Sequence, residues 1–233
     1  MNRTVNVVRM QLVNRTTFLV VPLLILTAAF VLTLAIYAIV SRSIGASEPM
    51  NAGGASGAPL WYFAVLGVQA LTMTFPFSQA MSVTRREFYQ GTLLAAGLGA
   101  FVVAAIYTAG GLIEGATDGW GMQGFFFRIP WVWNHGPLVA GFVFLVAAFL
   151  LFVIGFAGAT VYRRFGLLVL VGLGLTIGVA IVGALWLIGH LDAWAAVGDW
   201  FTTQGSVGLA LWGVALAAAL AGATYAILRR LVV

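Results

Sequence analysis

The stretch PLVAGFVFLVAAFLLFVIGFAGATVY occupies residues 137–162, and FGLLVLVGLGLTIGVAIVGALWLI occupies residues 165–188, with only Arg163-Arg164 between them. Both stretches are uncharged and longer than the ~20 residues that an α-helix needs to cross the hydrocarbon core of a bilayer. Backbone polar groups in lipid must be paired within the protein, which favours helices. These stretches therefore predict two membrane-spanning helices joined at one membrane face by the two arginines.

Uncharged apolar segments of similar length occur throughout the chain. Of its 233 residues, 62% are hydrophobic and only 7% are charged, whereas a soluble domain has about 25% charged residues. We expect an all-α polytopic membrane protein that forms a single transmembrane domain over residues 1–233. The six predicted spans are residues 17–40, 60–81, 91–113, 137–162, 165–188 and 207–228.

Residues 1–15, ahead of the first predicted span, combine apolar and basic residues at helical spacing. Val5, Val8 and Leu12 recur on one face, with Arg9 and Arg15 on either side of it. This pattern favours an amphipathic helix in the membrane interface, with its apolar side in lipid and its guanidinium groups among phosphates. The alternative is a frayed tail that carries basic residues.

The arginines are distributed unevenly between the two ends of the predicted spans. If the N-terminus is cytoplasmic, only Arg42 and Arg128 lie outside, and short cytoplasmic loops normally carry the basic excess. An arginine-only composition rich in Ala, Gly, Val and Leu suggests a bacterial source. We therefore predict a multi-pass protein of the bacterial cytoplasmic membrane with both termini in the cytoplasm. The arginines predicted inside are Arg3, Arg9, Arg15, Arg85, Arg86, Arg163, Arg164, Arg229 and Arg230.

Missing residue types exclude several kinds of chemistry. The chain has no cysteine, which excludes disulfides and thiolate sites. It has no lysine, which excludes a P-loop and Schiff-base chemistry. His135 falls in a predicted loop, and the pair His190 and Asp192 has no third ligand, so we expect no metal site. We expect neither catalysis nor a cofactor in this chain, and no nucleic-acid partner.

No predicted span carries an ionisable residue near its middle, where ion-coupled carriers usually need one. The nearest candidate is Glu114, just beyond the third span, and we interpret it as an acid at the headgroup boundary. Gln69, Thr72, Thr74 and Ser78 follow one another along the second span. These four residues either line a polar pathway or make interhelical hydrogen bonds.

Small and aromatic residues predict how the spans pack and where they end. Gly174 and Gly178 form a Gly-x-x-x-Gly motif in the fifth span, which lets helices approach closely in lipid. Segments 114–136 and 189–206 are rich in aromatic residues, which predicts belts at the outer membrane surface. A re-entrant element within residues 189–206 is an equal alternative.

The connection between the second and third spans is the most distinctive loop. Thr84 and Glu87 have the spacing of a capping box, which predicts a short charged helix just before the third span. Such an element, with Arg85 and Arg86 beside the cap, suits contact with a soluble partner. The alternative is a helix start with two positive-inside arginines.

This layout resembles the permease subunits of type-2 ABC exporters, which have an interfacial N-terminal helix, six spans and both termini inside. Residues 82–91, with the string Arg-Arg-Glu-Phe-x-x-Gly, look like the coupling loop of that family. The resemblance implies a separate ABC ATPase subunit that binds ATP and Mg, and a second permease copy, identical or not. The connection at Arg163-Arg164 departs from it in being too short for a second contact. The implied docking residues are Thr84, Arg85, Arg86, Glu87, Phe88 and Tyr89.

Two other functions fit the same sequence. A stand-alone ion-coupled carrier would act without an ATPase, and it would need to bind its ion through groups other than charged side chains at the midplane. A non-transporting membrane anchor or assembly factor would recruit a partner through the same loop.

Overall fold

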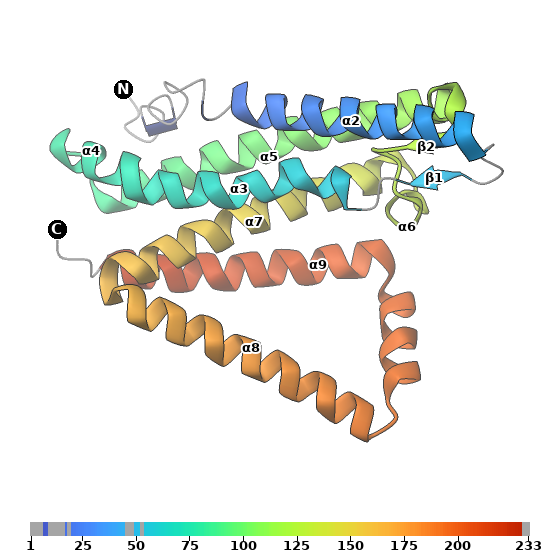
Figure 1. Cartoon of the computed structure of the whole chain (residues 1–233). Helices are drawn as coiled ribbons and strands as arrows, with labels where there is room; N and C mark the ends of the chain where they lie inside the picture. Colours follow the sequence, from blue (N-terminus) through green and yellow to red (C-terminus); the bar gives the residue numbers. More distant parts are fainter. Residues whose placement is uncertain (1–6, 9–16, 18–19, 45–48, 52–53, 230–233) are drawn as a thin grey trace.

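The computed structural model describes residues 7–8, 17, 20–44, 49–51 and 54–229 (Figure 1). Within these residues, six helical stretches are long and apolar enough to cross a membrane. The chain is an all-α polytopic membrane protein, which confirms the predicted fold class. In chain order the elements are α2 (Val21–Ile44), β1 (Met50–Asn51), η2 (Ala55–Gly57), α3 (Ala58–Gln69), η3 (Ala70–Thr74), α4 (Phe75–Ala80), α5 (Arg85–Ala116), η4 (Gly119–Gln123), β2 (Gly124–Phe125), α6 (Pro130–Trp133), α7 (Pro137–Phe165), α8 (Leu167–His190) and α9 (Trp194–Leu228).

The helix bounds differ from the predicted spans mainly at three places. The first span is shifted, because α2 begins at Val21 and continues to Ile44. The third begins earlier, because α5 starts at the cap before Arg85. The last begins at Trp194, because an additional helical segment precedes it. Of the predicted interfacial helix only residues 7–8 are described; they are helical, and the rest of it lies outside the described residues.

The two ends of the helices differ in chemistry, and we name them accordingly. The arginine-rich end comprises residues 81–86, 163–166 and 227–229. The aromatic end comprises residues 49–51, 54–57, 117–136 and 190–206. The short parallel pair β1–β2, which joins Met50 to Gly124 and Asn51 to Phe125, lies at the aromatic end.

Helix α7 is the centre of the bundle and packs against α3, α5 and α9 (Figure 1). Its backbone comes close to that of α3 at two glycines, Gly67 on α3 and Gly155 on α7. A Cβ atom at Gly67 would overlap the carbonyl oxygen of Phe152, and one at Gly155 would overlap that of Ala64. The two backbones therefore touch directly, which is how helices gain van der Waals contact in lipid.

Aromatic side chains close the bundle at the aromatic end. Phe126 and Phe127 are buried, and the ring of Phe30 contacts both of them. The Tyr107 ring packs edge-on against Phe127 at a centroid distance of 5.3 Å. This part of the predicted aromatic belt therefore lies in the protein core, whereas Trp131 is 52% exposed.

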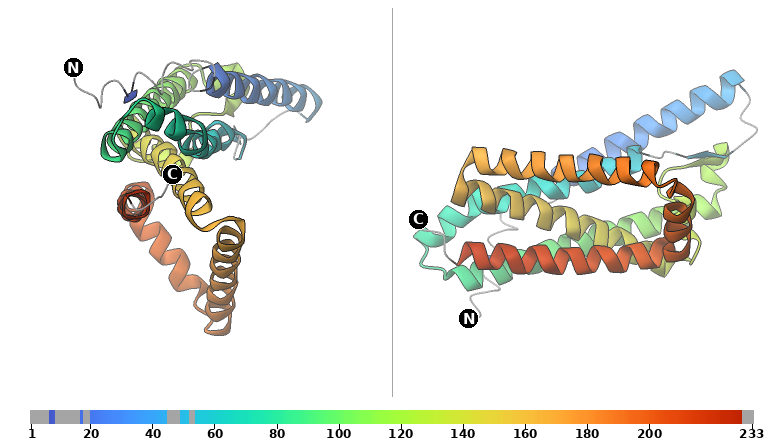
Figure 2. Two further views of the ribbon diagram at one scale, coloured as in Figure 1. Left: turned by 90° about the vertical axis from the view of Figure 1, so that its left-hand side faces the viewer. Right: turned by 90° about the horizontal axis from the view of Figure 1, so that it is seen from below.

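Helix α8 leaves the bundle almost as soon as it begins. It turns away from α7 at Gly166, whose φ of 84° is in the region that favours glycine. Among the described elements it has substantial contacts only with α7, and none of its residues is buried. Figures 1 and 2 show α8 diverging from the other helices.

Helix α9 returns the chain to the bundle in two parts. Its first segment, residues 194–204, crosses at a steep angle to the remainder, and the chain bends at Gly205, where φ is 57° (Figure 1). The second part lies along α7. The first segment thus runs across the spanning helices, and both the interfacial and the re-entrant interpretation of residues 189–206 stay predictions.

Candidate functional site

The predicted capping box is present at the start of α5. The Thr84 hydroxyl accepts a hydrogen bond from the Glu87 backbone N–H at 3.3 Å, and Glu87 Oε2 accepts one from the Thr84 N–H at 2.9 Å. The cap prediction is confirmed. The expected separate short helix is wrong, because α5 continues without a break from Arg85 to Ala116.

The turn before the cap is tight and internally bonded. Ser82 has a positive φ of 57°, and the Val83 N–H donates to the Ser78 carbonyl at 3.2 Å. The Gln79 side-chain amide donates to the Val83 carbonyl at 3.1 Å. These bonds hold the connection between the second and third spans in one conformation, so it presents a fixed surface.

Two of the predicted docking residues lie inside the bundle. Phe88 is fully buried and its ring packs edge-on against Phe75 at 5.0 Å. Tyr89 packs against the Tyr225 ring, and its hydroxyl donates to the Ala221 carbonyl at 2.7 Å. These rings join α5 to neighbouring helices, so a partner at the turn would meet other side chains.

Two arginines at the arginine-rich end cap the C-terminus of α9. Arg85 donates to the Arg229 carbonyl at 3.1 Å, and Arg164 donates to the Ile227 carbonyl at 3.2 Å. The last carbonyls of a helix have no partner within it and attract cations. Arg85 therefore joins α5 to α9, a role that positive-inside counting could not reveal.

Arg163 also donates to a backbone carbonyl, but this carbonyl lies within the second span, at Thr72. Pro76 has no N–H, so the Thr72 carbonyl four residues earlier lacks its usual donor. The π-helical segment η3 lies at this point, and the Arg163 guanidinium donates to the Thr72 carbonyl at 2.9 Å. In the sequence, the only indication of this contact is Pro76 within an apolar span, which leaves a carbonyl without its N–H donor. An arginine elsewhere in the chain can then donate to that carbonyl.

The polar series of the second span surrounds this irregular segment. Thr72 donates its hydroxyl to the Val68 carbonyl, and the buried Ser78 donates to the Phe75 carbonyl. Gln69 and Thr74 are half-buried. The two hydroxyl groups are thus paired within their own helix, and a pathway lined by these four residues stays a prediction.

The side chains that remain available at the turn form a small polar surface. Arg86 is exposed and, among the described residues, its guanidinium makes neither an ion pair nor a hydrogen bond. Met81 is 61% exposed and supplies the apolar part. We call this set the turn surface. Its members are Met81, Ser82, Arg86 and Gln90.

Glu114, which the sequence places at the headgroup boundary, lies inside the protein, a burial that the sequence does not indicate. It is completely buried, and its carboxylate accepts four hydrogen bonds. The donors are the Trp120 indole at 3.0 Å and the backbone N–H groups of Phe126, Phe127 and Arg128 at 2.9, 2.8 and 2.9 Å. Both carboxylate oxygens are thus occupied in ordering the 119–128 loop.

The histidines offer no metal centre. His190 stacks on the Trp186 ring, with the ring centroids 5.2 Å apart. In the part of the chain that the structure describes, no group of three His, Asp or Glu side chains could hold a metal ion.

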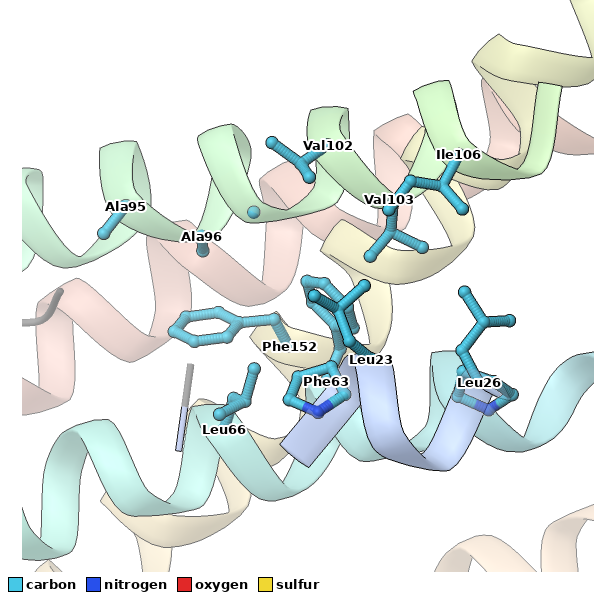
Figure 3. A pocket seen from close by; sticks show the side chains of 13 residues that line it. Leu23, Leu26, Phe63, Leu66, Ala95, Ala96, Val102, Val103, Ile106 and Phe152 are labelled. Carbon is cyan, nitrogen blue, oxygen red and sulfur yellow. The ribbon is translucent and has the colours of Figure 1, made fainter. Parts of the chain in front are cut away.

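An apolar cavity of about 90 Å³ lies between α2, α3 and α5 (Figure 3). Phe63, Leu66 and Phe152 form its floor and are at most 3% exposed. At the rim, Leu23 and Val102 are 43% and 45% exposed. All thirteen lining residues are apolar, so the cavity suits a hydrocarbon group rather than an ion.

The predicted packing motif of the fifth span faces open space. Among the described residues, apart from the neighbouring backbone of α8 itself, no atom lies within 4 Å of a Cβ placed at Gly174 or Gly178. The close approach of two helices at glycines is instead between α3 and α7, at Gly67 and Gly155. Packing at Gly174 and Gly178 therefore requires something outside this copy, and stays a prediction.

Comparison with protein-family models, with curated proteins and with solved structures gives no match for this chain.

Proposed function

We propose that this chain is the permease subunit of an ATP-driven exporter, which binds a separate ATPase through the turn surface and acts as a dimer. The observation that carries the proposal is the exposed guanidinium of Arg86. Arg85, Arg163 and Arg164 all donate to backbone carbonyls, whereas the exposed Arg86 guanidinium, beside the capped turn, has no hydrogen-bond or ion-pair partner among the described residues. Arginine beside an exposed apolar side chain, here Met81, is a common centre of binding energy at protein interfaces.

The dimer is supported by α8. A helix in a membrane bundle normally packs at least one face against protein, and this one buries no residue. Leu175, Val179, Val182 and Trp186 share one face with its glycines. Packing of small residues against a second copy would give that face the contact that it lacks within one copy.

The cargo proposed is apolar or amphipathic, such as a lipid or a hydrophobic drug. The apolar cavity supports this class, because it would leave a charged group without a partner. The proposed location is the bacterial cytoplasmic membrane, with the arginine-rich end in the cytoplasm, where the positive-inside rule places it.

Sidedness is tested with single cysteines, since the chain has none of its own. Ser82 and Thr203 are exposed at opposite ends of the molecule. In intact cells an impermeant maleimide should label Thr203→Cys and leave Ser82→Cys unlabelled. The reverse pattern would place the turn surface outside the cell and refute ATPase docking there.

Docking is tested by purifying the tagged full chain from its native membranes and measuring vanadate-sensitive ATP hydrolysis in the purified complex. Arg86→Glu should reduce the co-purifying activity about tenfold or more, because reversing an interfacial charge costs several kcal/mol. Arg42→Glu, at an exposed arginine in the last turn of α2, is the matched control. Thr84→Ala removes the cap at a cost of about 1 kcal/mol and should retain the ATPase.

Other outcomes identify the competing functions. An Arg86→Glu chain that retains full, coupled ATPase activity would show that the turn is only a helix start. Transport by the purified chain in liposomes without an ATPase would identify a carrier. Partner binding without any cargo-stimulated ATP turnover would identify an anchor or assembly factor.

A further inference from the structure

The aromatic end holds an arginine that none of the features above explains. Arg128 is exposed, and among the described residues its guanidinium makes no ion pair and no hydrogen bond. The guanidinium lies against the Trp133 ring, whose centroid is 5.6 Å from Cζ. The nearby carboxylate of Glu114 is already occupied by four N–H donors, one of which is the Arg128 backbone.

The backbone on which Arg128 stands is held firmly in place. Glu114 binds the N–H groups of three consecutive residues, Phe126 to Arg128, and is itself fully buried on α5. A carboxylate that accepts several backbone hydrogen bonds makes charge-assisted bonds, which are stronger than neutral ones. Glu114 is therefore a positioning residue for the start of the Arg128 side chain.

The Arg128 and Trp133 side chains both lie close against α5, each at a glycine. A Cβ at Gly115 would overlap a terminal nitrogen of Arg128, and a Cβ at Gly111 would overlap the Trp133 ring. The indole N–H of Trp133 donates to the Phe127 carbonyl at 3.2 Å, which fixes the ring. The guanidinium thus lies between the α5 backbone and a fixed indole, at little further entropic cost when it binds a ligand.

A recess of about 290 Å³ opens beside this guanidinium. Its wall carries two side-chain amides, Asn51 and Asn134, which can donate to an anion. A single water occupies only ~30 Å³, so the recess can hold a much larger group. The other lining residues are Pro49, Phe125, Arg128, Pro130 and Trp133.

We propose that this recess binds the phosphate of a phospholipid headgroup. Arginine presents a planar fork of donors that matches phosphate oxygens, and a guanidinium held on an aromatic ring keeps that fork in one orientation. Tryptophans concentrate at the depth of lipid headgroups, and Trp120, Trp131 and Trp133 all lie at this end. Leu138, 89% exposed on the first turn of α7, begins an apolar surface for the acyl chains only four residues after Asn134.

The proposal is independent of the exporter function and of which leaflet faces this end. It is tested on the delipidated full chain in detergent by native mass spectrometry, titrating phosphatidylglycerol and, separately, diacylglycerol, which lacks the phosphate. Wild-type chain should bind phosphatidylglycerol roughly tenfold more tightly than diacylglycerol, as expected for hydrogen bonds to a charged group. Arg128→Gln should abolish that preference, and Arg42→Gln, at another exposed arginine, should retain it.

Gly115→Ala keeps every charge but displaces the guanidinium, so it should also lose most of the preference. Equal preference in wild type and Arg128→Gln would overturn the proposal, as would equal losses in Arg128→Gln and Arg42→Gln, which indicate attraction by charge alone. Inorganic phosphate that binds as tightly as phosphatidylglycerol would show a site for a free anion and refute the lipid assignment. Size-exclusion profiles and melting curves establish that each variant is folded.

Discussion

Helices α7 and α8 are adjacent in sequence and similar in composition, but they have opposite surroundings. α7 buries Phe144, Phe152 and Phe156 and brings its backbone against α3 at Gly155. α8 has more glycine along one face, and yet none of its residues is buried. In lipid, apolar surface gains little by moving from acyl chains to protein, so hydropathy alone does not separate the two environments. Shape does, because a helix packs where backbones can touch and rings can fill the space around them.

The largest expected effect is at the glycine contact in α7. Gly155→Leu would force the α3 and α7 backbones apart, and overpacking of this kind costs about 3 kcal/mol or more. Gly178→Leu in α8 meets no atom of the same copy and should change the free energy of unfolding by less than about 0.5 kcal/mol. Denaturant unfolding of the detergent-solubilised chain, at a concentration where it is monomeric, measures both. Similar losses at the two positions would contradict the arrangement of α8.

A smaller loss of stability is expected at Glu114, which is buried within the bundle on α5. Glu114→Ala leaves an indole and three backbone N–H groups without their acceptor, which should cost about 2 kcal/mol and expose the 119–128 loop to proteases. Asp199→Ala, in the exposed first segment of α9, is the matched control and should leave stability near wild type. Melting curves measure the stability of the two variants, and limited proteolysis measures the exposure of the loop. Equal stability and equal protease sensitivity would contradict the burial of Glu114.

The smallest effect is expected at the contact between Arg163 and Thr72, which joins the last turn of α7 to the second span. Arg163→Ala should cost about 1 kcal/mol, the net value of one hydrogen bond. Pro76→Ala restores an N–H that can reach the Thr72 carbonyl, so Arg163→Ala should then cost little. A double-mutant cycle measures this coupling, and strictly additive effects would mean that Pro76 and Arg163 act separately.

The sequence predicts the spans and the Thr84–Glu87 cap, because both follow from local patterns: long uncharged runs, and a Thr and a Glu three residues apart. It does not predict which residues of those spans are buried. Phe88 and Tyr89 adjoin a charged loop but turn inward, because α5 continues through them and aromatic partners on α4 and α9 are within reach. Glu114 is buried because a loop twelve residues later supplies its donors, a contact that no local pattern records.

The most direct test of the central claim, that α8 completes its packing against a second copy, is a cysteine scan in native membranes. Leu175, Val179, Val182 and Trp186 on α8 are replaced one at a time, and Leu94, Leu98 and Phe101, also exposed on α5, serve as controls. Disulfides need Cα atoms within about 7 Å. We predict oxidative dimers at α8 positions with a helical period and none on α5. Monomers throughout the α8 scan, or equal cross-linking on α5, would contradict the claim and indicate that lipid covers α8.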